Sequence, residues 1–292
     1  MDEETVGDGG GREFVRVAGE LRARMTDGTY GLHSILPPQR KLADLFGVSR
    51  DTVQRVIKEL GSEGWIETRQ GSGSRVVRTQ HIHSPTSSKR PDRTVTLGPL
   101  INRAFEQREV VLDVYTLTSE SLEAHIRTQT ERIRARQIAP QRVALRMMLP
   151  SEDLDLPYWR TGAPEEDRAL KDRFLDIARR HTTSLRTVLK DWRTMELVPS
   201  VELEIRWAPL APAFKLYLIN GSEALHGLYE VFPRAIELPD GREVMATDVF
   251  GLGALLTHHV KDAADPYAQD TVFVEGLQAW FDSVWEHLGV SP

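Results

Sequence analysis

The sequence contains no cysteine. This absence excludes disulfide bonds, thiolate metal sites and cysteine nucleophiles, and it is compatible with a reducing cytosol. No uninterrupted apolar run approaches the roughly 20 residues that span a bilayer. The first residues, up to Phe14, lack the basic and apolar segments of a secretory signal. We therefore expect a cytoplasmic protein with no membrane contact.

Basic residues are outnumbered in the chain as a whole, with 37 Lys or Arg against 43 Asp or Glu and a formal net charge of -6. The charge is unevenly distributed, because residues 12–80 hold 12 Lys or Arg against 8 Asp or Glu. Residues 81–292 hold 25 against 31. A basic N-terminal block on an acidic body is expected when one domain meets phosphate and the other does not.

The pattern along the chain predicts two domains. Residues 1–11 are acidic and glycine-rich, which predicts a disordered leader. Residues 12–78 form the first predicted domain, and the polar, proline-containing stretch 79–96 is a predicted linker. Residues 97–292 alternate helical and strand-like patterns, which predicts an α/β layered domain for effector sensing or dimerisation. The predicted helices of this domain cover residues 97–108, 119–137, 165–191, 247–260 and 271–288. The predicted strands are Val110–Thr116, Val143–Leu149, 201–207, 214–219 and Tyr229–Pro233.

The first domain shows the element order helix, loop, short helix, glycine turn, helix and β-ribbon. The first helix begins near Glu13, the second covers Gln39–Phe46, and Ser49 stands at the N-cap position of the third. Two short strands, Trp65–Arg69 and Ser74–Arg78, flank a glycine-rich turn. This order is typical of an α+β winged helix-turn-helix.

The third helix is a candidate recognition helix. Its apolar face is expected to point inward and its polar residues outward, toward a major groove. Arg can read guanine through two hydrogen bonds, and Gln can read adenine. Arg40 is placed to meet phosphate, and the small wing residues let backbone amides approach DNA. The predicted DNA-binding residues are Arg40, Ser49, Arg50, Thr52, Gln54, Arg55, Gly71, Ser72 and Gly73.

The run from Leu36 to Val76 resembles the DNA-binding domain of the GntR family of bacterial regulators. Matching positions include Leu36-Pro37, Arg40, Gly47-Val48-Ser49-Arg50, Thr52-Val53 and Gly71-x-Gly73. Pro38-Gln39 stands where Ser-Glu is usual, and Gln54 replaces a usual Arg. The resemblance implies an operator-binding regulator, here a repressor, that forms a homodimer and responds to a small-molecule effector.

The second domain resembles the phospholipase D-like superfamily in one stretch. Lys215 matches the Lys of the His-x-Lys, four residues, Asp signature, and Gly227 matches the glycine that follows. Ala213 stands at the position of the nucleophilic His, and Asn220 at that of the Asp. Because alanine cannot form a phospho-enzyme, the resemblance implies a degenerate domain without catalysis. Lys215 could then remain as an anion-binding group.

Lys215, Asn220 and His226 are the candidate ligand-binding residues of this domain, and a solvated strand face is the alternative for Lys215 and His226. His258-His259 could ligate a metal, but the adjacent leucines favour a helix end. The stripe Trp280, Phe281, Val284, Trp285 and Leu288 indicates core or a dimer face. We expect no catalytic residue, metal or cofactor.

The sequence thus favours a DNA-binding transcription regulator that is not an enzyme, with double-stranded operator DNA as its partner. A phosphodiesterase-like enzyme with an accessory DNA-binding module is one alternative. A winged helix used for protein interaction is the other.

Overall fold

The computed structural model describes residues 9–26, 28–63, 65–69, 73–77, 82–83, 97–238, 240–250 and 255–291. The chain divides into two compact units, residues 1–79 and 80–292. No helix in these described ranges is long and apolar enough to cross a membrane.

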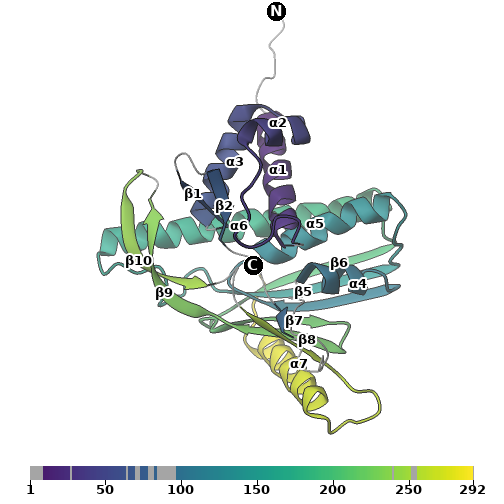
Figure 1. The fold of residues 1–292 in the computed structure, drawn as a ribbon. Helices are drawn as coiled ribbons and strands as arrows, with labels where there is room; N and C mark the ends of the chain where they lie inside the picture. Colours follow the sequence, from purple (N-terminus) through teal and green to yellow (C-terminus); the bar gives the residue numbers. More distant parts are fainter. Residues whose placement is uncertain are drawn as a thin grey trace, which may run out of the picture. The chain divides into compact units, whose positions relative to one another are not determined.

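The N-terminal unit contains three helices and a two-stranded ribbon (Figure 1). These are α1 (Gly9–Thr26), α2 (Gln39–Phe46), α3 (Arg50–Glu63), β1 (Ile66–Arg69) and β2 (Gly73–Val76). Apolar residues three or four apart on each helix are buried, among them Val17, Leu42 and Val56. The predicted winged helix-turn-helix is confirmed. The predicted disordered leader 1–11 is wrong at its end, because α1 begins at Gly9, and residues 1–8 lie outside the described ranges.

The C-terminal unit is built on a seven-stranded mixed sheet in the order β3-β11-β8-β7-β4-β5-β6. Strands β4, β5 and β6 are parallel neighbours, while β7 and β8 continue the sheet in antiparallel pairing. The strands are β3 (Ile82–His83), β4 (Glu109–Tyr115), β5 (Arg142–Pro150), β6 (Ser200–Ala208), β7 (Phe214–Ile219), β8 (Glu223–Leu228) and β11 (Leu256–Val260). Strand β3 lies within the predicted linker 79–96, whose other residues are outside the described ranges.

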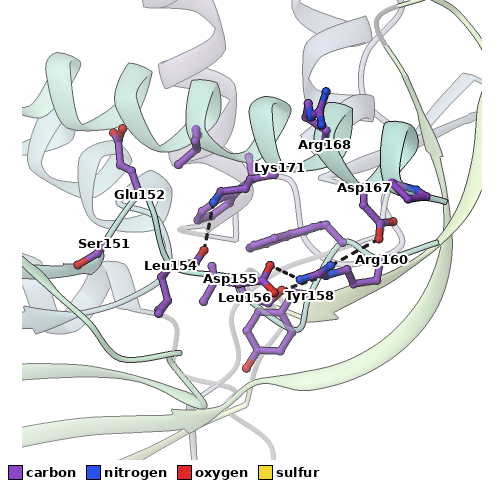
Figure 2. Close-up of a pocket in the computed structure, with 14 residues that line it drawn as sticks. Ser151, Glu152, Leu154, Asp155, Leu156, Tyr158, Arg160, Asp167, Arg168 and Lys171 are labelled. Atoms are coloured by element: carbon purple, nitrogen blue, oxygen red, sulfur yellow. Dashed lines mark hydrogen bonds and ion pairs between the residues drawn. The ribbon is translucent and has the colours of Figure 1, made fainter. Parts of the chain in front are cut away.

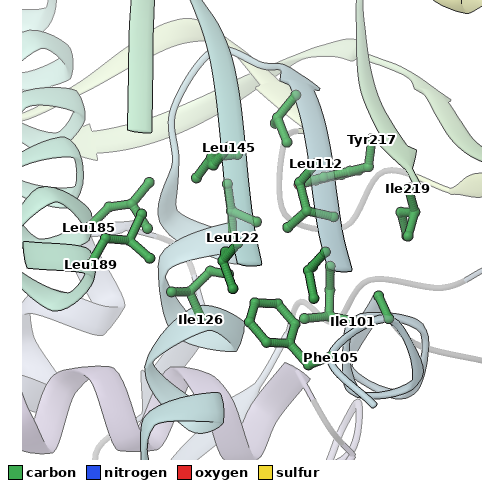
Figure 3. Packing of buried hydrophobic residues seen from close by; sticks show 14 of the residues in the cluster. Ile101, Phe105, Leu112, Leu122, Ile126, Leu145, Leu185, Leu189, Tyr217 and Ile219 are labelled. Carbon is green, nitrogen blue, oxygen red and sulfur yellow. The ribbon is translucent and has the colours of Figure 1, made fainter. Parts of the chain in front are cut away.

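Helices cover both faces of this sheet (Figure 1). They are α4 (Leu97–Ala104), α5 (Glu120–Arg134), α6 (Pro164–Thr194) and α7 (Gln269–His287), close to the predicted bounds. Figure 3 shows α4, α5 and α6 packing on one face through Ile101, Ile126 and Leu185. On the other face, Phe281 and Trp285 of α7 belong to a second hydrophobic cluster, which includes Leu216 of β7. The predicted α/β layers are therefore confirmed, and the aromatic stripe of α7 is mainly core.

A separate antiparallel ribbon is formed by β9 (Glu230–Glu237) and β10 (Glu243–Phe250). The predicted helix over 247–260 is wrong, because its described residues belong to β10 and β11. All eight residues of β10 pair with β9. Strand β9 comes just before β10 in the chain, and its pairing with β10 outweighs the local helical pattern of these residues. The ribbon packs through Ile236 and Ala246 against Trp159 and Phe174 in a third cluster.

Candidate nucleic-acid interface and ligand-site residues

The turn between α2 and α3 is fixed by a left-handed residue and a cap. Gly47 ends α2 with φ of 64°, a conformation that costs an L side chain about 1–2 kcal/mol. Two residues later, Ser49 Oγ accepts a hydrogen bond of 3.0 Å from the Thr52 amide. This is the N-cap geometry that satisfies an otherwise unbonded amide of the first turn. The predicted capping role of Ser49 is confirmed.

The exposed face of α3 is polar. Arg50, Asp51, Gln54 and Arg55 are exposed, whereas the apolar face, Val53, Val56, Ile57 and Leu60, is buried. The orientation of this helix is therefore as predicted. Its exposed side chains carry the hydrogen-bonding groups that read base edges.

The expectation that Thr52 points outward is wrong. Thr52 is only 6 % exposed, and its Oγ1 lies 2.9 Å from Ser49 Oγ. The short polar side chain is thus used inside the cap, because a hydroxyl near a helix N-terminus finds local partners. Helical spacing alone places Thr52 on the outward face, because it makes no allowance for this local bond.

Two arginines flank the exposed face. Arg40 is exposed in the first turn of α2, as expected for a phosphate contact. The Arg55 guanidinium carbon lies 5.2 Å from the centroid of the Phe14 ring of α1. This cation–π geometry limits the rotamers of Arg55 and leaves its nitrogen donors at the surface.

The wing is a short antiparallel ribbon in which Arg69 pairs with Gly73 and Ile66 with Val76. Gly73 has φ of 80°, and a Cβ there would lie 3.2 Å from Ile35 Cγ2. The positive φ favours glycine at this position, and the short contact means that Ile35 would have to shift for a larger residue. Gly71 and Ser72, the other predicted wing-tip residues, lie outside the described ranges. DNA contact by the nine predicted residues stays a prediction.

The three candidate ligand residues of the C-terminal unit are not brought together. Lys215 pairs with Gly227 in the β7–β8 register, and Leu216 pairs with His226. Side chains alternate between faces along a strand, so Lys215 and His226 lie on opposite faces of the sheet. Lys215 and His226 therefore cannot line one site together, and ligand binding by any of the three residues stays a prediction.

Lys215 is buried rather than solvated, with 3 % exposure. Its Nζ lies 5.9 Å from the centroid of the Tyr229 ring. Burial lowers the pKa of Lys215 to about 7, while the nearby carboxylate of Glu120 opposes this shift. The alternative of a solvated strand face is also wrong for this residue.

Asn220 and His226 have structural partners. Asn220 adopts φ of 51° in the β7–β8 turn, and its Oδ1 accepts a 2.8 Å hydrogen bond from the Val111 amide. His226 is half-buried, with ring centroids 5.0 Å from Phe214 and 6.0 Å from Phe273. Burial lowers the pKa of His226. These contacts tie the turn and the α7 face to the sheet.

The His258-His259 pair lies in strand β11. The prediction that it lies at a helix end is therefore wrong. His258 Nε2 lies 2.7 Å from Glu223 Oε2, and His259 Nδ1 lies 2.7 Å from Asp270 Oδ1. The two side chains point to opposite faces because they are adjacent in a strand. Among the described residues, no group of three or more potential ligands gathers around a metal position.

Sequence reasoning missed a cavity of about 320 Å³ beside α6 (Figure 2). It lies between the segment Ser151–Arg160, which follows β5, and the first three turns of α6. Seven of its lining residues are apolar or aromatic: Leu154, Leu156, Tyr158, Trp159, Pro164, Phe174 and Leu175. The carboxyl ends of parallel strands are where open α/β sheets bind ligands. The cavity lies at the carboxyl end of β5, so the prediction of this strand from the sequence could have indicated the site.

Trp159 in this cavity wall has φ of 57°, which is rare for a bulky side chain and costs of order 1–3 kcal/mol. Contacts with β10 hold it there. Its amide donates to Thr247 O over 2.6 Å, and its Nε1 donates to Asp248 Oδ1 over 2.8 Å. The indole stacks on Phe174 with centroids 4.0 Å apart. The strained backbone therefore places an aromatic wall beside the cavity.

The capped helix, its polar exposed face and the ribbon define a winged helix-turn-helix DNA-binding domain. Residues 14–76 match the model of the bacterial regulatory proteins of the gntR family. The N-terminal unit therefore carries a gntR-family domain, which confirms the resemblance drawn from Leu36–Val76. The similarity of the C-terminal unit to phospholipase D-like domains stays a prediction.

Two curated relatives and one solved structure show how far the similarity extends. The Exu regulon transcriptional regulator of Escherichia coli K12 is 39 % identical over 72 residues, which cover 25 % of this chain and 28 % of the relative. The Uxu operon regulator of Haemophilus influenzae is 33 % identical over 81 residues, covering 28 % and 30 %. A transcriptional regulator from Oenococcus oeni is 21 % identical, covers 26 % of this chain and 61 % of its own, and has a TM-score of 0.20. The chain matches less than a third of the length of the two curated relatives.

Proposed function

We propose that this chain is a sequence-specific transcription regulator that binds operator DNA through the exposed face of α3 and the wing. The observation that carries the proposal is a capped α3 whose exposed side chains, Arg50, Gln54 and Arg55, lie within the segment that matches the gntR family. The relatives named above are regulators of a regulon and of an operon, which supports the same class.

The net positive charge of residues 12–80 supports contact with the phosphate backbone. Arg40 and the wing are assigned to this positioning role, which carries no sequence information by itself. Arg50, Gln54 and Arg55 are assigned to reading base edges. Thr52 acts indirectly in this scheme, because it orients the first turn of α3 through Ser49.

Selection of genomic DNA fragments by the purified protein at two salt concentrations tests the proposal. A recovered motif that is pseudo-palindromic supports a homodimer, because a two-fold protein needs two half-sites. Fragments without a motif, lost at the higher salt, would mean non-specific phosphate contact only. Salt-insensitive capture of a protein, with no DNA affinity, would favour the protein-interaction alternative.

Binding of protein variants to the recovered DNA motif then tests the assigned base-reading residues. Arg50→Ala and Arg55→Ala should each weaken motif binding by about tenfold to a hundredfold, the effect of losing one bidentate base contact. Arg186→Ala removes the same charge from an exposed position on α6 and should leave binding unchanged. Unchanged binding by both Arg50→Ala and Arg55→Ala would refute the recognition-helix assignment.

The finer parts of the proposal are repression, control by a small-molecule effector and the lack of enzymatic activity. Ala213 supplies no nucleophile at the position where phospholipase D-like enzymes have His, and Lys215 beside it is buried. We therefore expect no turnover of bis(p-nitrophenyl) phosphate. A promoter fusion carrying the recovered motif distinguishes repression from activation by the sign of the change when the protein is removed.

A further inference from the structure

The cavity beside α6 has the size and wall chemistry of a small-molecule site. Its volume of about 320 Å³ lies at the lower end of the range typical of ligand pockets, about 300–1,000 Å³. Its floor combines Leu154 and Leu156 with the rings of Tyr158 and Trp159. Such walls favour a flat apolar body of one or two rings, because aromatic faces gain most from close stacked or edge contacts.

The charged side chains around the cavity differ in whether they have ion-pair partners (Figure 2). Asp155 and Asp167 both form ion pairs with Arg160. Glu152 is held by Arg179, with 2.9 Å between Arg179 Nε and Glu152 Oε1. The three lining carboxylates therefore already have cationic partners.

Lys171 is placed differently from these groups. Its Nζ donates to the backbone carbonyl of Leu154 over 3.3 Å and forms no ion pair within 4 Å among the described residues. Its charge nevertheless reaches the cavity wall, since it helps to lower the pKa of Glu152 after the larger effect of Arg179. An ammonium has three donors, so Lys171 can still bind an anion.

The chemistry of the remaining donors separates a carboxylate from a phosphate. Phosphate sites usually offer an Arg fork or free amides at a helix N-terminus. Two arginines line this cavity: Arg160 is engaged by two carboxylates, and Arg168 is exposed to solvent. Asp167 Oδ1 accepts the amides of Thr161 and Gly162 just before α6. Lys171, which forms no ion pair among the described residues, is a point charge suited to a monoanion.

We propose that this cavity binds a small aromatic carboxylate, with its ring against Tyr158 and Trp159 and its carboxylate on Lys171. The strained backbone of Trp159 fits this assignment, because such outliers are retained where the surrounding structure fixes a wall of a site. The proposal deepens the effector part of the proposed function and rests on it only for the regulatory role of the ligand.

Calorimetric titration of the full chain with 1-naphthoate and with uncharged 1-naphthamide tests the site. We expect the acid to bind about tenfold or more tightly than the amide, as for one charge-assisted hydrogen bond. Lys171→Gln should abolish this difference. Lys190→Gln makes the same change at an exposed position about 28 Å further along α6 and should preserve it.

A second variant tests the cavity without touching the lysine. Ser151→Phe places a ring in the cavity from its rim and should abolish binding of the acid, while the melting temperature reports that the chain remains folded. Equal affinity for acid and amide would overturn the proposal, as would undiminished binding by Lys171→Gln or by folded Ser151→Phe. Absence of binding by naphthoate, benzoate, salicylate and indole-3-acetate at about 10 mM would also overturn it.

Inorganic phosphate serves as the competing probe. Displacement of naphthoate by millimolar phosphate at constant ionic strength would overturn the carboxylate assignment, and its absence is expected. None of these titrations contains DNA, so failure of the ligand site and failure of operator binding are separate results. The effector role is tested afterwards by adding the bound acid to the operator complex.

Discussion

His125 on α5 makes the stability of the C-terminal unit depend on pH in a defined window. The residue is 3 % exposed, and its Nε2 has no hydrogen-bond partner among the described residues. Burial lowers the pKa of His125 to about 4, from about 6.5 for a solvated imidazole. The folded state therefore holds this imidazole neutral at neutral pH.

The direction of the effect follows from proton binding. Between about pH 6.5 and about pH 4 the unfolded chain binds a proton at His125 that the folded chain does not bind, so stability falls as the pH falls. The full difference of about 2.5 pKa units corresponds to about 3 kcal/mol. Of this, about 2 kcal/mol is lost between about pH 7.5 and about pH 5.

Two other buried groups, Glu123 and Lys215, titrate largely outside this interval. The pKa of Glu123 is lowered to about 2, mainly by its hydrogen bond with His181 and by Arg127 against the cost of burial, so its effect is lost below about pH 4.5. The pKa of Lys215 is lowered to about 7 by burial, so its contribution changes mainly above that pH. The interval between about pH 7.5 and about pH 5 therefore reports chiefly on His125 among these three.

Urea unfolding of wild-type chain and His125→Leu at the two pH values measures the effect. Five of the six tryptophans lie beyond residue 97, so their fluorescence follows the C-terminal unit. We expect the pH-dependent loss to shrink by about 2 kcal/mol in the variant, whatever its absolute stability. His287→Leu, at an exposed position of α7, should keep the wild-type dependence. A His125→Leu variant with the wild-type pH dependence would refute the reasoning.

Three further substitutions have defined outcomes. Ser49→Ala removes the cap of α3 and should cost about 1 kcal/mol by thermal unfolding of the N-terminal unit, with weaker operator binding; no change in either would contradict the capping role. Gly47→Ala meets no atom within 4 Å but must adopt φ of 64°, so circular dichroism melting should show a loss of about 1–2 kcal/mol, and a gain would disprove the strain argument. Asp113→Ala removes the carboxylate that pairs with Arg146, where Nε lies 2.7 Å from Oδ1 and Nη2 lies 2.6 Å from Oδ2. The loss should cost about 3 kcal/mol by urea unfolding. A cost below about 1 kcal/mol would show that Asp282 alone is enough to pair with Arg146.

The sequence by itself determined the N-terminal unit. Its helices, the cap at Ser49 and the turn at Gly47 are local features, since each partner lies within a few residues along the chain. The apolar spacing on α3 likewise fixed which residues face inward. Thr52 is the exception, because its hydroxyl bonds locally to Ser49 instead of following the helical face. Local interactions of this kind can be read from neighbouring residue types.

Only the tertiary structure decided the ligand candidates of the C-terminal unit. The face on which Lys215 and His226 lie depends on the register of β7 with β8, and the strand character of 247–250 depends on pairing with β9. The cavity joins the end of β5 to the first turns of α6, and the backbone of Trp159 is held by β10. The β7–β8 and β9–β10 pairings join strands that are neighbours in the chain, but local residue patterns do not specify their register. The cavity and the backbone of Trp159 rest on contacts between segments further apart in the chain.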